Sequence, residues 1–586
     1  MLPPGRASEL ALAHVYDRDR TGPELLTFLR RETITIERLT APMTTQSTDS
    51  SATTDEHRNR NAERAQLHST IWRIANDLRG SVDGWDFKQY VLGMLFYRYL
   101  SESQVRFVES QDIDMPDRFE NLSDDVFDDN EDAKDYFINE RGFLLLPSQL
   151  FSNVYKNAPH NQNLNETLAN VFKAFEESAR GTDSESNVKG LFDDFVLDSN
   201  KLGVSPAARH ENLLKLMDAV AGMNLEKGYE DSENDAFGDA YEYLMGMYAA
   251  NAGKSGGEYY TPQEVSELLA KIAMDGRDAE QIRTVYDPAC GSGSLLLKVK
   301  RELGKNSDGL RFVGQEINLT TYNLCRMNMI LHGVPVDDFS IAHGDTLIDP
   351  KHRGGAGGDF EEPFGAIVSN PPYSTKWKGD DDPTLIHDDR YAPAAVLAPK
   401  SKADLAFTMH MLKSLDEAGT AAIVEFPGVL YRGGAERKIR EYLLKQNVVD
   451  AVIQLPANLF YGTSIATCIL VLKKGRRKDH SVLFVDASQL FDKGTNQNIL
   501  GKSHREKILE VLAAREEREH FSALVPVEKL LEQEANLAVS SWVEPEDTRE
   551  RVDIVELNSR IENIVARQAQ LRVEIDAIVA RLEGGE

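Results

Sequence analysis

Hydrophobic residues recur at three- and four-residue spacing in the first half of the chain. Two runs show it, separated by Gly80 and Gly84: Leu67, Ile71, Ile74, Leu78, and then Phe87, Val91, Leu95, Tyr99. This period is typical of amphipathic helices. Helical patterns continue to about Tyr248 between acidic, Asn-rich loops, so we predict an α-helical N-terminal domain over 66–248. Residues 1–65 have little to bury, and we expect a disordered extension there.

The pattern changes near Gly253, where short β-rich runs begin to alternate with helices. The predicted strands are Thr284–Asp287, Phe312–Gln315, Ser340–Ala342, Ala366–Ser369, Ala421–Glu425, Val448–Gln454 and Thr467–Leu472. Such alternation predicts an α/β domain with a mostly parallel sheet and helices on both faces. We expect a Rossmann-like core of seven strands over 249–486, with Val482–Val485 as a candidate edge strand.

The last segment, 487–586, returns to polar loops and helices and ends in a heptad pattern. Its apolar positions are Ile554, Leu557, Ile561, Ile564, Leu571, Ile575, Ile578 and Leu582, with Gln568 in one core position. About four heptads are enough to indicate a coiled-coil tail that docks on a partner helix. A terminal helix that packs on its own domain is the alternative.

Composition restricts the class of protein. No apolar run approaches the roughly 20 residues that span a bilayer, and no secretory signal opens the chain, so we expect no membrane contact. Cys290, Cys325 and Cys468 have no metal-ligand or disulfide spacing, which predicts no metal and fits a cytoplasmic protein. The net charge of −29 is unfavourable for a protein that binds DNA alone. Either the substrate is not nucleic acid, or a basic partner makes much of the DNA contact.

A glycine turn between a strand and a helix is the strongest local signal. The strand ends at Asp287, and the string continues as Pro-Ala-Cys-Gly-Ser-Gly-Ser294. Glu316 ends the next strand, where an acceptor for ribose hydroxyls is expected. A nucleotide-type ligand is therefore predicted. The third glycine of a dinucleotide motif is missing, and Asp287 would repel a phosphate but suit a sulfonium or ammonium group, which favours S-adenosylmethionine over NAD.

A second motif, Asn370-Pro371-Pro372-Tyr373, follows the buried run Ala366–Ser369. Two prolines remove backbone donors and stiffen the turn. The Asn370 side-chain oxygen and the Pro371 carbonyl remain as acceptors that can orient a planar amine, and Tyr373 can stack on a base flipped out of a duplex. A rigid structural turn is the alternative reading.

The string Asp-Pro-Ala-Cys-Gly-Ser-Gly-Ser resembles the first motif of amino-group DNA methyltransferases. The resemblance implies that S-adenosylmethionine is bound by residues of this motif and of four other segments. They are Asp287, Ala289, Gly291, Gly293 and Ser294, with Glu316 on the ribose, Asp345 on the adenine, Tyr260, Thr261 and Pro262 at the border of the cofactor, and Asn370 of the second motif. Capping of a turn or helix is the alternative role for Asp345 and Thr261.

Other segments are less specific. Asp404-Leu-Ala-Phe407 resembles a further cofactor-flanking motif, although Phe407 is equally compatible with a core position. Gly428–Gly434 resembles the segment beside the flipped base, and the role of Tyr431 there stays unassigned. The polar stretch 374–402 contains lysines that could meet phosphates, among aspartates that favour a solvated loop.

The whole chain, from Leu67 onward, resembles the modification subunits of Type I restriction-modification systems. The helical string Ile71-Trp-Arg-Ile-Ala-Asn-Asp-Leu-Arg-Gly and Glu258-Tyr-Tyr-Thr-Pro are typical of that family. The resemblance implies N6-adenine methylation of double-stranded DNA. It also implies a separate specificity subunit clamped by two modification subunits, and a restriction/translocase subunit in the full complex. A protein or RNA methyltransferase and a noncatalytic clamp subunit remain as alternatives.

Overall fold

The computed structural model describes most of the chain from Asp86 onward. The described ranges are 86–111, 117–127, 131–223, 261–307, 309–352, 362–460, 463–474, 480–495, 497–545 and 554–584, with a few isolated positions between 69 and 244. The predicted extension 1–65, the first helical run at Leu67–Leu78 and the segment Gly256–Tyr260 lie outside these ranges.

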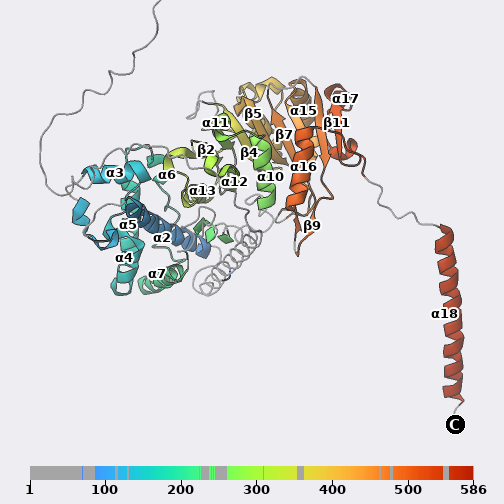
Figure 1. The fold of residues 1–586 in the computed structure, drawn as a ribbon, viewed down its shortest axis with the longest axis horizontal. Coiled ribbons are helices and arrows are strands. Elements are labelled where there is room, and N and C mark those ends of the chain that lie inside the picture. The colour runs from blue at the N-terminus through green and yellow to red at the C-terminus, as the bar shows by residue number, and fades with distance from the viewer. Residues whose placement is uncertain are drawn as a thin grey trace, which may run out of the picture.

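The N-terminal part is helical, as the spacing predicts (Figure 1). Its helices are α2 (Asp86–Ser110), α3 (Glu131–Arg141), α4 (Phe151–Asn157), α5 (Leu164–Ser178), α6 (Glu185–Val188) and α7 (Pro206–Ala221). On α2, Val91 and Leu95 are fully buried, and their four-residue spacing places them on one face. Helix α2 packs on α4 and α7, and these two residues of the apolar pattern belong to the core of this part.

The second part is built on a nine-stranded sheet in the order β11-β8-β6-β7-β5-β4-β1-β2-β3. The strands are β1 (Thr284–Asp287), β2 (Arg311–Glu316), β3 (Phe339–His343), β4 (Phe364–Ser369), β5 (Leu415–Glu425), β6 (Val449–Gln454), β7 (Cys468–Lys473), β8 (Ser481–Asp486) and β11 (Ser522–Pro526). A small hairpin, β9 (Asp492–Lys493) with β10 (Asn498–Ile499), stands apart from it. Pairing is parallel from β3 to β5 and between β6 and β8, whereas β7 and β11 run antiparallel to their neighbours.

The prediction of a mostly parallel α/β sheet is confirmed, but the strand number differs from seven. Val482–Val485 lies in β8, and it is not an edge strand because β11 pairs with it. β11 comes from Ser522–Pro526, beyond the residue 486 at which we ended the catalytic domain. Its pattern, Ser-Ala-Leu-Val-Pro, has too few apolar residues to signal a strand, and pairing with β8 makes it one.

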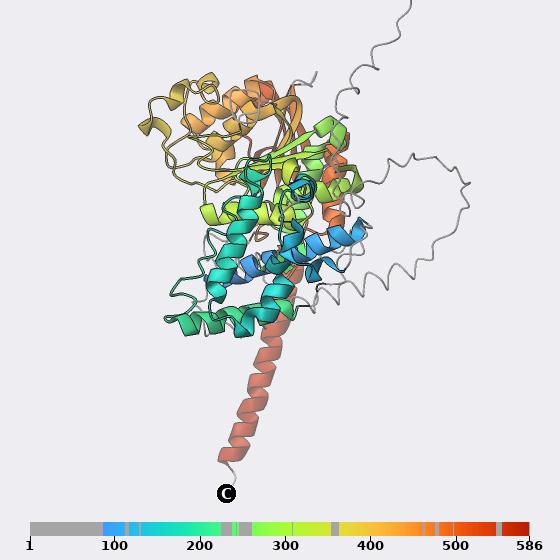
Figure 2. The same ribbon diagram turned by 90° about the vertical axis from the view of Figure 1, so that its left-hand side faces the viewer.

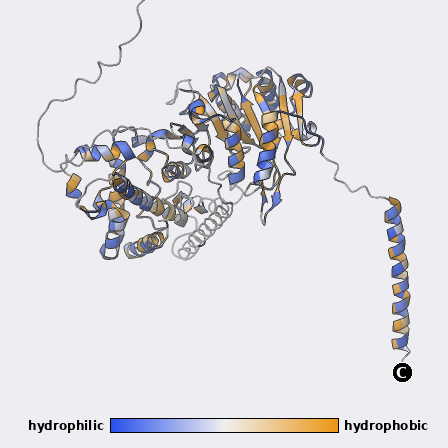
Figure 3. Cartoon of the chain, in the orientation of Figure 1, coloured by the Kyte–Doolittle hydropathy of each residue, from blue (hydrophilic) through white to orange (hydrophobic). Residues whose placement is uncertain are grey.

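Alternating side chains divide the core between the two faces of the sheet. Val285, Ala366 and Val368 face a cluster that continues into the helical N-terminal part. Tyr286 and Ile367 face the other cluster. Helices α10 (Gln263–Met274), α12 (Ser294–Leu303), α13 (Leu319–Leu331) and α16 (Lys502–Ala514) contribute buried residues to the first cluster, and α14 (Asp404–Ser414), α15 (Ala435–Lys445) and α17 (Val527–Glu532) to the second. The hydropathy colouring shows the apolar strands between these helices (Figure 3).

The helical part and the sheet part are joined by buried polar contacts. Arg326 of α13 donates to the carbonyls of Ser186 and Lys189 at 3.2 and 2.7 Å, and its guanidinium lies 4.2 Å from the ring centre of Tyr322. Asn187 donates to two carbonyls near β3. These bonds satisfy groups that would be costly to bury unpaired, and they fix the helical part against the sheet.

The heptad residues lie on one helix, α18 (Ile554–Glu583), with no buried residue. In two perpendicular views it extends away from the sheet and from the helical part (Figure 1 and Figure 2). The alternative of a terminal helix packed on its own domain therefore does not describe this structure. Within the described residues, no helix combines the length and apolar character needed to cross a membrane.

Gly365 in β4 lies where another part of the backbone approaches very closely. A Cβ at this position would lie 2.0 Å from the Ile282 carbonyl oxygen, and Ile282 ends the short helix α11 (Ala279–Ile282). We expect Gly365→Ala to lower the free energy of unfolding by about 1–3 kcal/mol, because backbone must move. Thermal unfolding measures this. Gly433→Ala is the matched control, since a methyl group there would have no described atom within 4 Å. Equal melting temperatures for the two variants would contradict the close approach.

Candidate active site

Four neighbouring strands bring the predicted site residues to one edge of the sheet. β1 ends at Asp287, β2 at Glu316 and β3 at His343, while Asn370 follows the last residue of β4. These strands are parallel and adjacent, so their carboxyl ends meet at the same edge. Ligands of open α/β sheets bind at this edge.

Asp287 is a buried carboxyl group, only 1% exposed. Its Oδ1 accepts hydrogen bonds from the Ala289 amide at 3.0 Å and the Ser369 hydroxyl at 2.8 Å. Burial raises the pKa of Asp287 to about 7, and the charge of Glu316 contributes to the rise. The side chain is therefore poised to change charge near neutral pH.

The glycine turn follows directly and needs its glycines. Gly291 and Gly293 have φ of 54° and 78°, in the left-handed region. A Cβ on Gly293 would lie 2.8 Å from both Cys325 Sγ and Met329 Cε. Ser294 then begins α12, so the chain passes from strand to helix through this short turn, as the motif predicts.

Glu316 ties β2 to the glycine turn. One carboxylate oxygen accepts from the Gly291 amide at 3.1 Å, and the other accepts from the Asn318 amide at 2.8 Å. Burial raises the pKa of Glu316, and the amide donors partly oppose the rise. Each oxygen can accept a second hydrogen bond, so the carboxylate can hold a hydroxyl pair while it keeps the turn in place.

Asn370 joins two other predicted residues. Its Nδ2 donates to Thr261 Oγ1 at 3.1 Å, and its Oδ1 accepts from the Tyr373 hydroxyl at 2.6 Å. Asn370 is 6% exposed, Pro371 is buried, and Pro372 and Tyr373 are half-buried. Thr261 and Pro262 directly precede α10, so the start of this helix positions the Asn370 amide. Tyr260 lies outside the described residues.

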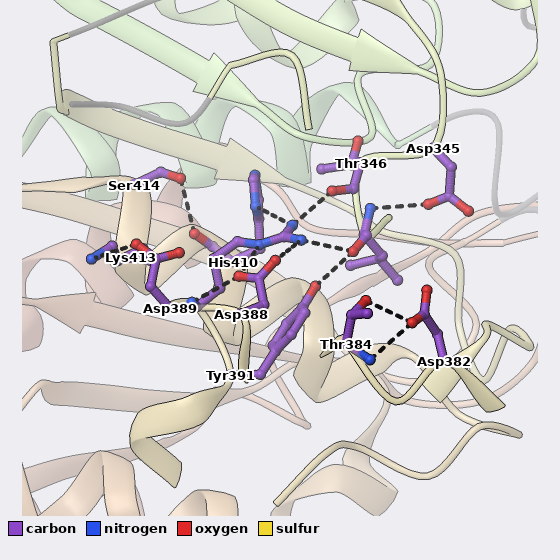
Figure 4. A network of polar contacts seen from close by, with 12 residues as sticks. Asp345, Thr346, Asp382, Thr384, Asp388, Asp389, Tyr391, His410, Lys413 and Ser414 are labelled. Atoms are coloured by element: carbon purple, nitrogen blue, oxygen red, sulfur yellow. Dashed lines mark hydrogen bonds and ion pairs between the residues drawn. The ribbon is translucent and has the colours of Figure 1, made fainter. Parts of the chain in front are cut away.

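Asp345 lies beyond β3, at the start of a tightly turned segment. Its Oδ1 accepts from the Leu347 amide at 2.9 Å, which is a turn-capping contact. Arg390 supports this segment by donating to the carbonyls of Thr346 and Leu347, each at 2.9 Å. Figure 4 shows this network, with Thr346, Asp388 and His410 labelled. The guanidinium also pairs with Asp388 at 2.8 Å and lies 3.2 Å from His410 Nδ1.

The sequence does not predict this role of Arg390, because the residue falls in the polar stretch 374–402, for which we expect a solvated loop. The structure differs there: Trp377, Arg390 and Tyr391 are buried, and the Trp377 amide donates to the Lys400 carbonyl at 3.0 Å. Lys400 pairs with Asp381 on the surface. Trp377, Arg390 and Tyr391 are the residues that could have indicated a buried segment, but their spacing shows no period.

Comparison with known proteins decides the family. The family model of N-6 DNA methylases matches residues 232–551, and that of the HsdM N-terminal domain matches 67–220. The chain belongs to the N-6 DNA methylase family. It is 47% identical over 531 residues to the Type I restriction enzyme MpnII methylase subunit of Mycoplasma pneumoniae, which covers 89% of this chain and 97% of that protein.

Two further relatives support the assignment to Type I methylase subunits. The MjaVII methylase subunit of Methanocaldococcus jannaschii is 29% identical over 430 residues, 72% of this chain and 70% of the relative. A solved Type I methyltransferase subunit from Streptococcus thermophilus superimposes with a TM-score of 0.73 at 37% identity, covering 82% of this chain and 100% of the other. This methylase subunit is thus a DNA methyltransferase of a restriction-modification system, and its family implies the use of S-adenosylmethionine.

The contact between Thr261 and Asn370 predicts a role for the threonine hydroxyl in activity. We expect Thr261→Val to lower kcat about tenfold, because the loss of a buried acceptor worth about 1–2 kcal/mol leaves the Asn370 amide without this partner. Thr261→Ser keeps the hydroxyl and is the control, with most of the activity retained. Methyl transfer by both variants in complex with the specificity subunit measures this, and equal activities would contradict the role.

Proposed function

We propose that this methylase subunit transfers the methyl group of S-adenosylmethionine to N6 of an adenine flipped out of double-stranded DNA, at the edge formed by Asp287, Glu316 and Asn370. The observation that carries the proposal is the bonding of Asn370. Its amide is held by Thr261 and Tyr373 at the end of β4, beside two buried carboxyl groups. This arrangement orients acceptors toward an amine, which suits direct transfer without a covalent enzyme intermediate.

The residues at this edge fit the proposed cofactor. Only Oδ1 of Asp287 accepts hydrogen bonds from the described residues, so Oδ2 is available to an ammonium group. Glu316 retains acceptor capacity on both oxygens for ribose hydroxyls. Ala289, Gly291, Gly293 and Ser294 supply small side chains that allow close approach to the backbone. When bound, S-adenosylmethionine supplies an electrophilic methyl group on a sulfonium.

The chain's own groups act on the base by binding and orientation. The Asn370 Oδ1 and the Pro371 carbonyl accept from the two amine hydrogens, which directs the nitrogen lone pair toward the methyl group. In the structure Oδ1 already accepts from the Tyr373 hydroxyl. An incoming amine uses the second lone pair of that oxygen or replaces the tyrosine. The Tyr373 ring then stacks on the flipped base.

The acidic charge of the chain supports a division of labour in the complex. With a net charge of −29, the subunit is poorly suited to bind DNA alone, so a basic partner would have to make much of the contact with the phosphates. We assign recognition of the sequence to a specificity subunit, held by two modification subunits, with a restriction/translocase subunit in the full complex. The exposed apolar residues of α18, such as Ile564 and Ile575, are the proposed docking surface for helices of the specificity subunit.

The deciding experiment tests the reaction, the partner and Asn370 together. The chain is co-expressed with its specificity subunit and incubated with labelled S-adenosylmethionine and amplified, unmethylated DNA. We expect N6-methyladenine to form with the complex and not with the chain alone. Asn370→Ala should lower kcat on the order of 100-fold, the loss typical of removing one preorganised polar group.

Other outcomes would separate the alternatives. Label in protein or RNA, with unlabelled DNA, would favour a methyltransferase acting on another planar nitrogen. A stable complex that transfers no methyl group, with or without the Asn370 substitution, would favour the noncatalytic clamp.

The raised pKa of Asp287 predicts a pH-dependent cofactor affinity. Its carboxyl, with a pKa of about 7, must ionise to pair with an ammonium group. We therefore expect S-adenosylmethionine to bind more tightly as pH rises from about 5.5 to about 7.5. This range lies below the usual pKa of an α-amino group, about 7.7–8.0, so the ammonium group stays mostly protonated throughout. Calorimetry in two buffers of different ionisation enthalpy should detect a proton released on binding at about pH 6.

Asp287→Asn should bind more weakly near pH 7.5 and release fewer protons. Glu316→Gln is the comparison variant, because burial also raises the pKa of Glu316. Unchanged proton release in Asp287→Asn, with loss in Glu316→Gln, would assign the pH dependence to Glu316 instead.

A further inference from the structure

Two buried carboxyl groups lie behind the catalytic turn and take no part in the chemistry described above. Asp404, the first residue of α14, is 1% exposed, and Glu425, the last residue of β5, is fully buried. In β5, Ile423 pairs with Ser369 of β4, so Glu425 lies one residue beyond the level at which the Asn370 motif begins. The pair therefore lies at the same edge of the sheet as the site.

Each carboxyl group has one satisfied oxygen. Asp404 Oδ1 accepts from the Ser374 amide at 2.9 Å, and Glu425 Oε1 accepts from the Thr408 hydroxyl at 2.7 Å. Asp404 Oδ2 and Glu425 Oε2 are buried and have no hydrogen-bond partner among the described residues. Two buried acceptor atoms without donors are costly, and a single proton shared between the groups would satisfy both.

The charges around the pair favour such a proton. Within the described parts of the chain, no ion pair involves Asp404 or Glu425. The titratable groups that act on Glu425 are Asp404 from α14, Glu436 from α15 and Cys468 from β7. Burial, and then the charge of Asp404, raise the pKa of Glu425 to about 8. The nearby cations, Arg432 and Lys402, act on Glu436.

Asp404 connects this pair to the catalytic motif. Ser374 directly follows Tyr373 and has a φ of 51°, a left-handed conformation that is unfavourable for a residue other than glycine. The hydrogen bond from its amide to Asp404 holds that conformation. The direction in which Tyr373 leaves the turn is therefore set by the position of Asp404.

We propose that Asp404 and Glu425 share one proton, and that Glu425 is a positioning residue for methyl transfer. In its neutral form Glu425 donates to Asp404, and Asp404 in turn fixes the Ser374 turn and the ring of Tyr373. When Glu425 ionises, the two carboxylates repel each other, Asp404 loses the proposed donor, and the turn loosens. This role rests on the proposed methyl transfer, whereas the shared proton itself can be measured without it.

The raised pKa also sets the sign of a stability effect. The folded chain retains the Glu425 proton more strongly than the unfolded chain does. The contribution of Glu425 to stability is therefore fully present below the ordinary pKa of 4.5 and is lost as pH rises to about 8.

The test compares three forms of the subunit in complex with its specificity subunit, with amplified, unmethylated DNA as substrate. In the unsubstituted protein, kcat should fall as pH rises from about 7 to about 9. Glu425→Leu should lower kcat about tenfold near pH 7, because Asp404 loses its donor. Glu425→Gln, whose amide can also donate, should restore most of kcat and abolish the fall at high pH. The affinity for S-adenosylmethionine should change less than about twofold in both variants.

A second measurement does not depend on activity. Infrared difference spectra recorded during a pH titration should show the carbonyl band of a protonated carboxyl group disappearing near pH 8, the pKa of Glu425, and Glu425→Gln should lack this change. Wild-type activity in Glu425→Leu, or the same pH profile in Glu425→Gln as in the unsubstituted protein, would overturn the proposal. Circular dichroism and thermal unfolding of each complex separate loss of fold from loss of positioning.

Discussion

Parallel pairing of β1 with β2 and β4 is the constraint on which the site depends. Val285 pairs with Ala366, and Asp287 pairs with Gly314, so the three strands end within two residues of one another. Asp287, Glu316 and Asn370 come from distant parts of the chain, and the backbone register alone makes them neighbours. This arrangement requires two close approaches, and a glycine stands at each. Gly365 lies between β4 and α11, and Gly293 lies between the glycine turn and α13.

The electrostatics of this edge follow from the burial of carboxyl groups. Asp287, Glu316, Asp404 and Glu425 are all buried there, and backbone amides of Ala289, Gly291, Asn318 and Ser374 are donors to the first three. Desolvation raises the pKa values of Asp287, Glu316 and Glu425, and the carboxyl oxygens make this edge rich in acceptors. An acceptor-rich site suits a cationic cofactor and the amino group of a base, whereas it is unfavourable for phosphates. This agrees with the proposal that a partner subunit makes much of the contact with the DNA backbone.

Support from behind the sheet edge is as important as the residues that face it. Arg390 fixes the carbonyls of Thr346 and Leu347 beside Asp345, and His410 and Tyr286 continue the buried network into the second core. Thr261 does the same for Asn370 from the start of α10. Fixed partners of this kind hold the orienting groups in place before substrate binds, which is how a site that works by orientation can accelerate transfer.

Elements with strong local signals can be read from the amino-acid sequence alone, whereas the other features depend on tertiary packing. Strand β1, the glycine turn, the Asn370 motif and the helical heptads were predictable, because period, glycine and proline report backbone geometry residue by residue. The family resemblance of these motifs was likewise readable, and the comparisons confirm it.

β11 has no strand pattern of its own and exists through pairing with β8, which moved the end of the sheet beyond residue 486. Arg390 and Glu425 gain their roles from partners 44 and 17 residues away, Thr346 and Thr408. Burial turns ordinary polar side chains into supports or proton-sharing groups, and burial is a property of the packed fold that no local pattern encodes.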